Sequence, residues 1–157
     1  MRRRQLLGIA AGLPFLAGAS SGASGPAAGA RRVRPGDPVW PSADQWAALK
    51  VQVGGNLIKP APLLEACQTD AKSADCRALL KSLQNPYFIG DQPSGTQVSG
   101  YLDAWTPAPS AYAVAAHSPA DVAAAVDFAR RHNLRLVVKG GGHSYLGTSN
   151  APDSLLI

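Results

Sequence analysis

The stretch AYAVAAHSPADVAAAVDFARRHNLRLVVKGGGHSYLG, residues 111–147, decides the fold. Residues 112–116 form a short apolar run that is typical of a strand. Ser118 follows as a helix N-cap, with proline next and an acid three residues after the cap. Residues 134–139 have the apolar character of a second strand. Strand, helix and strand in so short a span predict a βαβ unit with parallel strands and a right-handed crossover.

The predicted helix has one apolar face and a basic end. Residues 130–132, Arg-Arg-His, fall in its last turn, where cations suit the helix dipole, and Asn133 suits a left-handed stop. The apolar residues recur at helical spacing, so we expect them to face the core. They are Val122, Ala125, Val126 and Ala129.

Three glycines, Gly140, Gly141 and Gly142, come directly after the second predicted strand. In an α/β fold this is the edge of the sheet where ligands bind. A Rossmann or P-loop phosphate site would need a helix immediately after the glycines, and residues 143–152 contain no helix start. Successive glycine N–H groups can instead form a concavity for an anion. The alternative is a tight turn, which explains three glycines poorly.

The residues after the glycines add candidate ligand groups. Ser144, Thr148 and Ser149 carry hydroxyl donors, and Gly147 returns four residues after His143. From spacing alone, a histidine such as His143 is more often an ordinary polar residue than a reactive one. His117 and His132 are weaker candidates still, because they lie at predicted helix ends.

The N-terminus, residues 1–30, has the features of an export signal. Residues 3–7, RRQLL, resemble a twin-arginine motif, and the apolar run at 6–19 is shorter than a bilayer crossing. Residues 28–30 offer an A-x-A cleavage site, and residues 17–19 offer a rival one. The alternative is an ordinary secretory signal. Either signal predicts export to the periplasm or the extracellular space.

The charge balance argues against nucleic-acid binding. The whole chain has a net charge of +5, but residues 1–30 contribute three arginines and no acid. The remainder has 12 Lys+Arg against 10 Asp+Glu, a net charge of +2, which is too balanced for that function. Residues 31–34, Arg-Arg-Val-Arg, look like a solvated tail at the start of this remainder.

Residues 31–108 are expected to form a helical and extended arm. A capping-box pattern at residues 42–45 predicts a short helix with Trp46 and Leu49 turned inward. Residues 51–58 are interpreted as a turn between two extended pieces, and residues 63–83 as helical in two parts. Residues 85–109 are interpreted as a long irregular connection.

The chain has two cysteines, Cys67 and Cys76. An even cysteine count in an exported protein favours a structural disulfide between them. A metal site is the weaker alternative, because no histidine or second cysteine pair lies near in the sequence.

With these residues in view, residues 109–157 resemble the opening of the FAD-binding domain of the vanillyl-alcohol-oxidase superfamily, also called the p-cresol-methylhydroxylase type. The nearest likeness is to the berberine-bridge-enzyme-like branch. The motif [KR]-x-G-G-H-[SD]-Y-x-G, met here at residues 139–147, carries the resemblance. The resemblance implies an α+β fold in which the βαβ unit precedes a loop that lines the FAD diphosphate.

The resemblance also implies roles for single residues. His143 matches the histidine that bonds covalently to the 8α-methyl carbon of the flavin in many members. Ile157 ends the chain on what looks like an unfinished strand, so we expect a truncated domain. The cofactor-binding residues predicted in this way are Gly140, Gly141, Gly142, His143, Ser144, Tyr145, Gly147, Thr148 and Ser149.

The expected function is that of an exported FAD-dependent oxidase. Its flavin would take a hydride from an alcohol, a sugar hydroxyl or a benzylic carbon, and O2 would reoxidise it. We expect no stable membrane span and no nucleic-acid partner. One alternative is a dehydrogenase of the same superfamily that uses another acceptor. The other is a catalytically inactive fragment or binding module.

Overall fold

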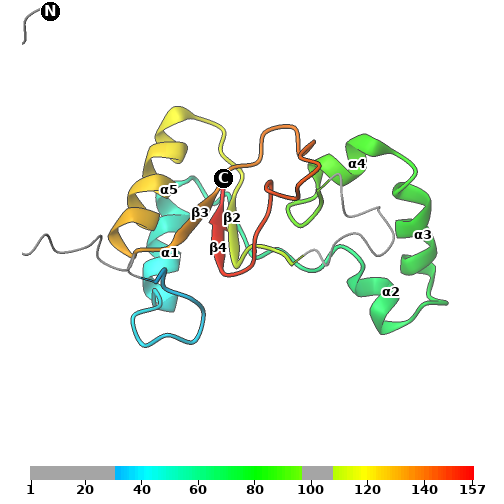
Figure 1. Cartoon of the computed structure of the whole chain (residues 1–157), viewed down its shortest axis with the longest axis horizontal. Helices are drawn as coiled ribbons and strands as arrows, with labels where there is room; N and C mark the ends of the chain where they lie inside the picture. Colours follow the sequence, from blue (N-terminus) through cyan, green and yellow to red (C-terminus); the bar gives the residue numbers. More distant parts are fainter. Residues whose placement is uncertain (1–30, 97–107) are drawn as a thin grey trace, which may run out of the picture. The chain divides into compact units, whose positions relative to one another are not determined.

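A computed structural model describes residues 31–96 and 108–157 of the 157-residue chain (Figure 1). Contacts divide the chain into residues 1–30 and a second unit, residues 31–157. The predicted export signal therefore lies outside the described residues. The elements are α1 (Ala43–Gln52), β1 (Leu57–Ile58), α2 (Glu65–Thr69), α3 (Ala74–Ser82), α4 (Pro86–Asp91), β2 (Tyr112–Val114), α5 (Pro119–Arg131), β3 (Arg135–Val137) and β4 (Ser154–Leu156).

The strands form one small mixed sheet in the order β1-β2-β4-β3. The predicted βαβ unit is confirmed as β2, α5 and β3, but its two strands are not neighbours. β4 lies between them and is parallel to both, so that Leu155 pairs with Tyr112 on one side and Leu136 on the other. β1 joins the other edge of β2 in the antiparallel sense. The expected α+β class is thus confirmed.

All three residues of β4 are buried, and Ser154 and Leu155 are completely so. A central parallel strand is covered on both faces, which explains why the consecutive residues Leu155 and Leu156 are both buried. Leu155 belongs to the main core, which otherwise comes from α1, α5 and the ends of the strands. The other members of this cluster are Trp46, Leu49, Val53, Val114, Ala125, Phe128, Ala129 and Leu134.

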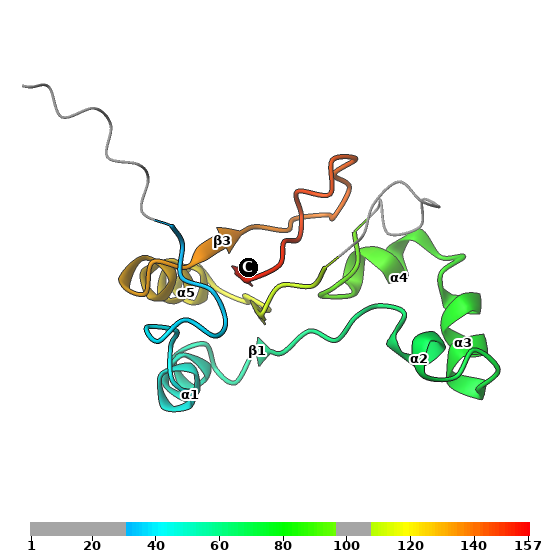
Figure 2. The same ribbon diagram turned by 60° about the horizontal axis from the view of Figure 1, so that its bottom comes forward.

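Helices α1 and α5 pack together beside the sheet, as Figure 2 shows. Trp46 of α1 stacks on Tyr112 with ring centroids 4.0 Å apart and lies 4.7 Å from the ring of Phe128. The prediction that Trp46 and Leu49 point inward is confirmed.

The buried face of α5 differs from the predicted one. It is formed by Ala125, Phe128 and Ala129, whereas Val122 and Val126 are each 40% exposed. The prediction for the two valines was wrong because Phe128, three residues after Ala125, has a larger apolar surface than either valine. Its ring faces Trp46 and sets the buried face of the helix.

The ends of α5 follow the sequence closely. Ser118 and Asp121 form a capping box, and a backbone hydrogen bond from His117 holds the pKa of Asp121 below its ordinary value. Asn133 takes the predicted left-handed conformation, with φ of 50°. His132 caps the helix, but burial lowers its pKa, and so does the charge of Arg131. Its surroundings therefore oppose the cationic form that the helix dipole favours.

Two predictions in the N-terminal part were wrong. α1 continues through Val51 to Gln52, so Val51 is helical and the extended piece begins only at Leu57. The connection expected to be irregular, residues 85–109, contains α4, and its residues 97–107 lie outside the described part of the chain. Asn85 caps this helix by accepting from the N–H of Tyr87, and Pro86 stands at its first turn.

The two-part helix at residues 63–83 is confirmed as α2 and α3. A disulfide joins Cys67 to Cys76, as the even cysteine count predicts. None of the helices in residues 31–96 and 108–157 has the length and apolar character needed to cross a membrane.

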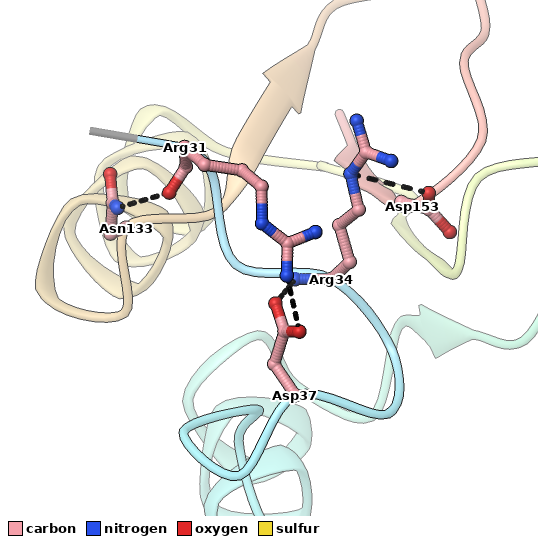
Figure 3. Close-up of polar contacts among 5 residues, drawn as sticks. All are labelled: Arg31, Arg34, Asp37, Asn133 and Asp153. Carbon is pink, nitrogen blue, oxygen red and sulfur yellow. Dashed lines mark hydrogen bonds and ion pairs between the residues drawn. The ribbon is translucent and has the colours of Figure 1, made fainter. Parts of the chain in front are cut away.

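Residues 31–37 form a polar clasp on the end of α5, not a solvated tail (Figure 3). The N–H of Val33 donates to the carbonyl of Asn133, and Val33 pairs with Leu134 as an added parallel bridge beside β3. The side chain of Asn133 donates to the carbonyl of Arg31 and accepts from the guanidinium of Arg32 at 2.8 Å.

Two ion pairs complete this clasp. Asp37 accepts from Arg31 at 2.6 Å, and Asp153 lies 3.8 Å from Arg34. Backbone bonding from Arg34, together with the charge of Arg31, lowers the pKa of Asp37. These pairs involve exposed arginines, so each should contribute little to stability by itself. The tail interpretation failed because its partners lie about a hundred residues away in the chain.

Asn133 provides a test of the clasp. Asn133→Ala should lower the free energy of unfolding by about 1–2 kcal/mol, because alanine resists the left-handed backbone and the clasp bonds are lost. Asn133→Gly keeps the backbone conformation and should lose less. Chemical denaturation measures both, with Arg130→Ala on the exposed face of α5 as a control expected to stay within about 0.5 kcal/mol. Equal losses for alanine and glycine would contradict a role for the backbone conformation.

Candidate functional site

A cavity of about 340 Å³ lies where the parallel strands end. Ala115 and Ala116 line it after β2, Val138 and Lys139 after β3, and Ile157 after β4. Each of these residues follows the carboxyl end of its strand, which is where open α/β sheets bind ligands. The glycine loop, residues 140–149, leaves the sheet at the same edge, directly after Lys139.

The cavity wall is mostly apolar and carries two charged residues, Asp91 and Lys139. Burial lowers the pKa of Lys139, and the negative charge of Asp91 opposes that shift. The ammonium of Lys139 donates to the carbonyls of Gln92 and Gly95, so its charge is used within the protein. We therefore do not count it as a free cation for a ligand.

The three glycines of the loop have different reasons to be glycine. A Cβ on Gly142 would meet the strain of a φ of 72°, and it would lie 3.6 Å from the Cα of Gly90. A Cβ on Gly141 would lie 2.9 Å from the imidazole Cδ2 of His143. A Cβ on Gly140 would meet no atom within 4 Å, so its side of the backbone is open.

The backbone of this loop offers three N–H donors. No residue in the described part of the chain accepts a hydrogen bond from the N–H groups of Gly140, Gly141 or Gly142. Gly140 and Gly141 are exposed. Three successive donors on a bare backbone suit an anion with several oxygen acceptors, and no side chain blocks its approach at Gly140. Gly142 is buried, so the anion concavity stays a prediction with these three N–H groups as its candidate donors.

The predicted hydroxyl donors contribute less. Ser144 Oγ and Thr148 Oγ1 lie 2.7 Å apart in a mutual hydrogen bond, and Ser144 also accepts from the N–H of Thr148. Gly147, with φ of 68°, closes the same turn by donating to the carbonyl of Ser144. Ser149 is buried. The hydroxyls of Ser144 and Thr148 therefore stabilise the loop.

Two predicted site residues are exposed at the surface of the loop. His143 is exposed above Gly141, and Tyr145 is 65% exposed. Leu146, which the sequence did not single out, is similarly exposed at 72%. The loop thus presents an imidazole, a phenol ring and an aliphatic side chain outward from the glycines.

Sequence reasoning missed the residues that hold the loop from outside. They come from the segment after α4, where the pattern predicted only irregular chain, and from Asn150, which no motif singled out. Pro93 and Gly95 are residues common in turns, so the sequence could predict a turn there. Nothing in the sequence indicated that this turn contacts the glycine loop. The described residues contain no cluster of His, Cys, Asp and Glu that could hold a metal ion.

Comparison with known proteins agrees with this geometry. Residues 109–157 match the family described as FAD-binding domain. The chain is 34% identical over 139 residues to the FAD-linked oxidoreductase patO of Aspergillus clavatus, an alignment covering 80% of the chain and 24% of that protein. It is 32% identical over 143 residues to the VAO-type flavoprotein oxidase VAO615 of Thermothelomyces thermophilus, covering 79% of the chain and 25% of that protein.

Solved structures show the same relationship. The crystal structure of the VAO-type flavoprotein MtVAO615 from Myceliophthora thermophila superposes with a TM-score of 0.66 at 32% identity, over 80% of the chain and 26% of that structure. MtVAO713 from the same organism gives a TM-score of 0.68 at 29% identity, over 80% and 25% respectively. The chain spans about a quarter of the length of these relatives. Residues 109–157 therefore match the FAD-binding domain family, and the chain is similar to FAD-linked oxidoreductases and VAO-type flavoproteins over about a quarter of their length.

Proposed function

We propose that the chain binds FAD through the glycine loop as part of an FAD-dependent oxidoreductase. The observation that carries this proposal is the row of three N–H groups at Gly140–Gly142, which find no acceptor in residues 31–96 and 108–157 and lie beside the cavity at the carboxyl edge of the sheet. These donors would hold the diphosphate. Bound FAD would supply a hydride acceptor for the substrate. The chain's own part is to bind and orient that cofactor.

Gly140 tests the cradle directly. In the protein expressed from its natural gene, Gly140→Ala should leave the free energy of unfolding unchanged or raise it by up to about 1 kcal/mol. The added Cβ meets no protein atom but would obstruct a diphosphate on the backbone. We expect FAD affinity to fall by roughly tenfold or more, equivalent to about 1.4 kcal/mol. Equilibrium titration measures this in a His143→Ala background, where FAD can be removed and binds reversibly, and an unchanged affinity would contradict the proposed cradle.

We propose further that an imidazole nitrogen of His143 would bond covalently to the 8α carbon of the flavin. The carbon and the nitrogen would each lose a hydrogen, and the two electrons released would pass through the flavin to O2, the acceptor proposed below. Its exposed imidazole next to the glycine donors supports this, as does its match to the superfamily motif. The neutral imidazole nitrogen is the nucleophilic form near pH 7. The absence of a side chain at Gly141 leaves room for the ring, since a Cβ there would displace the imidazole.

The covalent bond has a direct test. Protein precipitated in acid should retain yellow flavin on the peptide that contains His143, and His143→Ala should release the flavin to the supernatant. Gly141→Ala should lower the covalent fraction, because its Cβ would collide with the imidazole. Gly140→Ala, measured at saturating FAD, is the matched control that leaves the ring in place. Full release of flavin from the unaltered protein would show that FAD is held without a covalent bond.

For the reaction, we propose oxidation of an alcohol, a sugar hydroxyl or a benzylic carbon, with O2 as the acceptor. The similarity to a VAO-type flavoprotein oxidase supports this choice over a carrier-dependent dehydrogenase. One hydrogen peroxide formed for each substrate oxidised in air would agree with it. Turnover that needs an added electron carrier would favour the dehydrogenase.

We also propose that the protein is exported by the twin-arginine route, on the pattern of residues 3–7. Replacing Arg3 and Arg4 by lysine should stop export, because that route requires the arginine pair, whereas an ordinary secretory signal needs only the positive charge. Immunoblots of cell fractions measure this. The exported protein should begin at Arg31, and a start at Ser20 would favour the rival cleavage site.

A further inference from the structure

Both ends of the glycine loop are attached to one turn, Gln92–Gly95. The N–H of Gly95 closes this turn by donating to the carbonyl of Gln92 at 2.9 Å. Before the loop, Lys139 Nζ donates to the carbonyls of Gln92 and Gly95, the latter at 3.2 Å. After the loop, Asn150 Nδ2 donates to the carbonyl of Pro93 at 3.2 Å. Three carbonyls of one turn thus accept from the two residues that flank the loop.

The Gln92–Gly95 turn is also attached to the sheet, through Asn150. Its Oδ1 accepts from the N–H of Ser110 at 2.9 Å and from the Ser110 hydroxyl at 2.6 Å. Ser154, the first residue of β4, donates its hydroxyl to Ser110 at 2.8 Å. Ser110 and Ser154 are both completely or almost completely buried. A satisfied buried network of this kind allows little movement of its members.

Steric contacts hold the same surfaces together. A Cβ on Gly95 would lie 2.1 Å from the carbonyl oxygen of Ile89, so the turn cannot carry a larger residue there without moving. Gly142 of the loop lies against Gly90 of α4 and against the side chain of Lys139, with 3.6 Å from its ideal Cβ position to each. The glycine donors are therefore supported from behind by α4 and the turn.

We propose that Lys139 and Asn150 are positioning residues that hold both ends of the glycine loop on the Gln92–Gly95 turn. This arrangement fixes the three donor N–H groups before a ligand arrives. The inference rests on the proposed function, because the ligand of these N–H groups is taken to be the FAD diphosphate. A loop that is already ordered loses less conformational entropy on binding, and its affinity is higher for that reason.

The donors can be removed with little change of shape. Lys139→Met keeps an unbranched side chain without the ammonium, and Lys139→Arg restores a charged donor. Asn150→Asp keeps the oxygen that accepts from Ser110 but replaces the donor toward Pro93. Gly95→Ala moves the turn without altering either donor. Lys50→Met, on the exposed side of α1, is the matched control for a lost lysine.

The readout compares ADP, which has a diphosphate, with adenosine, which has none. All proteins in this comparison are expressed from the natural gene and carry His143→Ala, so that the flavin can be removed. Lys139→Met, Asn150→Asp and Gly95→Ala should each weaken ADP binding by about tenfold and leave adenosine binding unchanged. Lys139→Arg should recover most of the ADP affinity. A general loss of structure would weaken both ligands equally, and that result would overturn the positioning role.

Failure of the inference can be told from failure of the proposed function. If Gly140→Ala weakens ADP binding but the three variants do not, the cradle stands and the positioning role is wrong. If ADP does not bind the unaltered protein, the cradle itself is wrong and the inference falls with it. Should the variants not fold, amine labelling of the unaltered protein decides. Lys139 should react much more slowly than exposed Lys50, and equal labelling would overturn the proposal.

Discussion

The insertion of β4 between β2 and β3 is the constraint on which the structure depends. Leu155 is completely buried, and its strand pairs with β2 on one side and β3 on the other. Without β4 these two strands would not be joined in one sheet. Because β3 and β4 are parallel neighbours, the chain must leave β3 at the carboxyl edge and return to the opposite edge before β4 begins. Residues 138–153 make that return, and the glycine loop is its first part.

This return explains why the loop needs support from outside the βαβ unit. No helix covers the connection, so the loop lacks the rigid backbone that a crossover helix would provide. Support comes instead from α4 and the turn after it. Lys139 and Asn150 mark the two places where the connection meets that support. A segment with little apolar periodicity thereby becomes part of the candidate cofactor site.

Polar contacts also complete the sheet at its β3 edge. Val33 adds one parallel bridge beside Leu134, and the clasp satisfies the side chain of Asn133. Asn133 and Asp153 are the two non-glycine residues with positive φ in the described ranges, and both receive an arginine of the clasp. The clasp, residues 31–37, thus stabilises the two backbone positions that come just before β3 and β4.

The sequence by itself determined what depends on neighbours along the chain. The cap at Ser118, the left-handed stop at Asn133 and the strand pattern at residues 134–139 are local, so they predicted the βαβ unit and placed the glycines after it. Only the tertiary structure decided which strands are neighbours, which face of α5 is buried, and what holds the loop. Those outcomes depend on Leu155, Phe128 and Lys139 meeting partners remote in sequence, and no periodicity encodes such meetings.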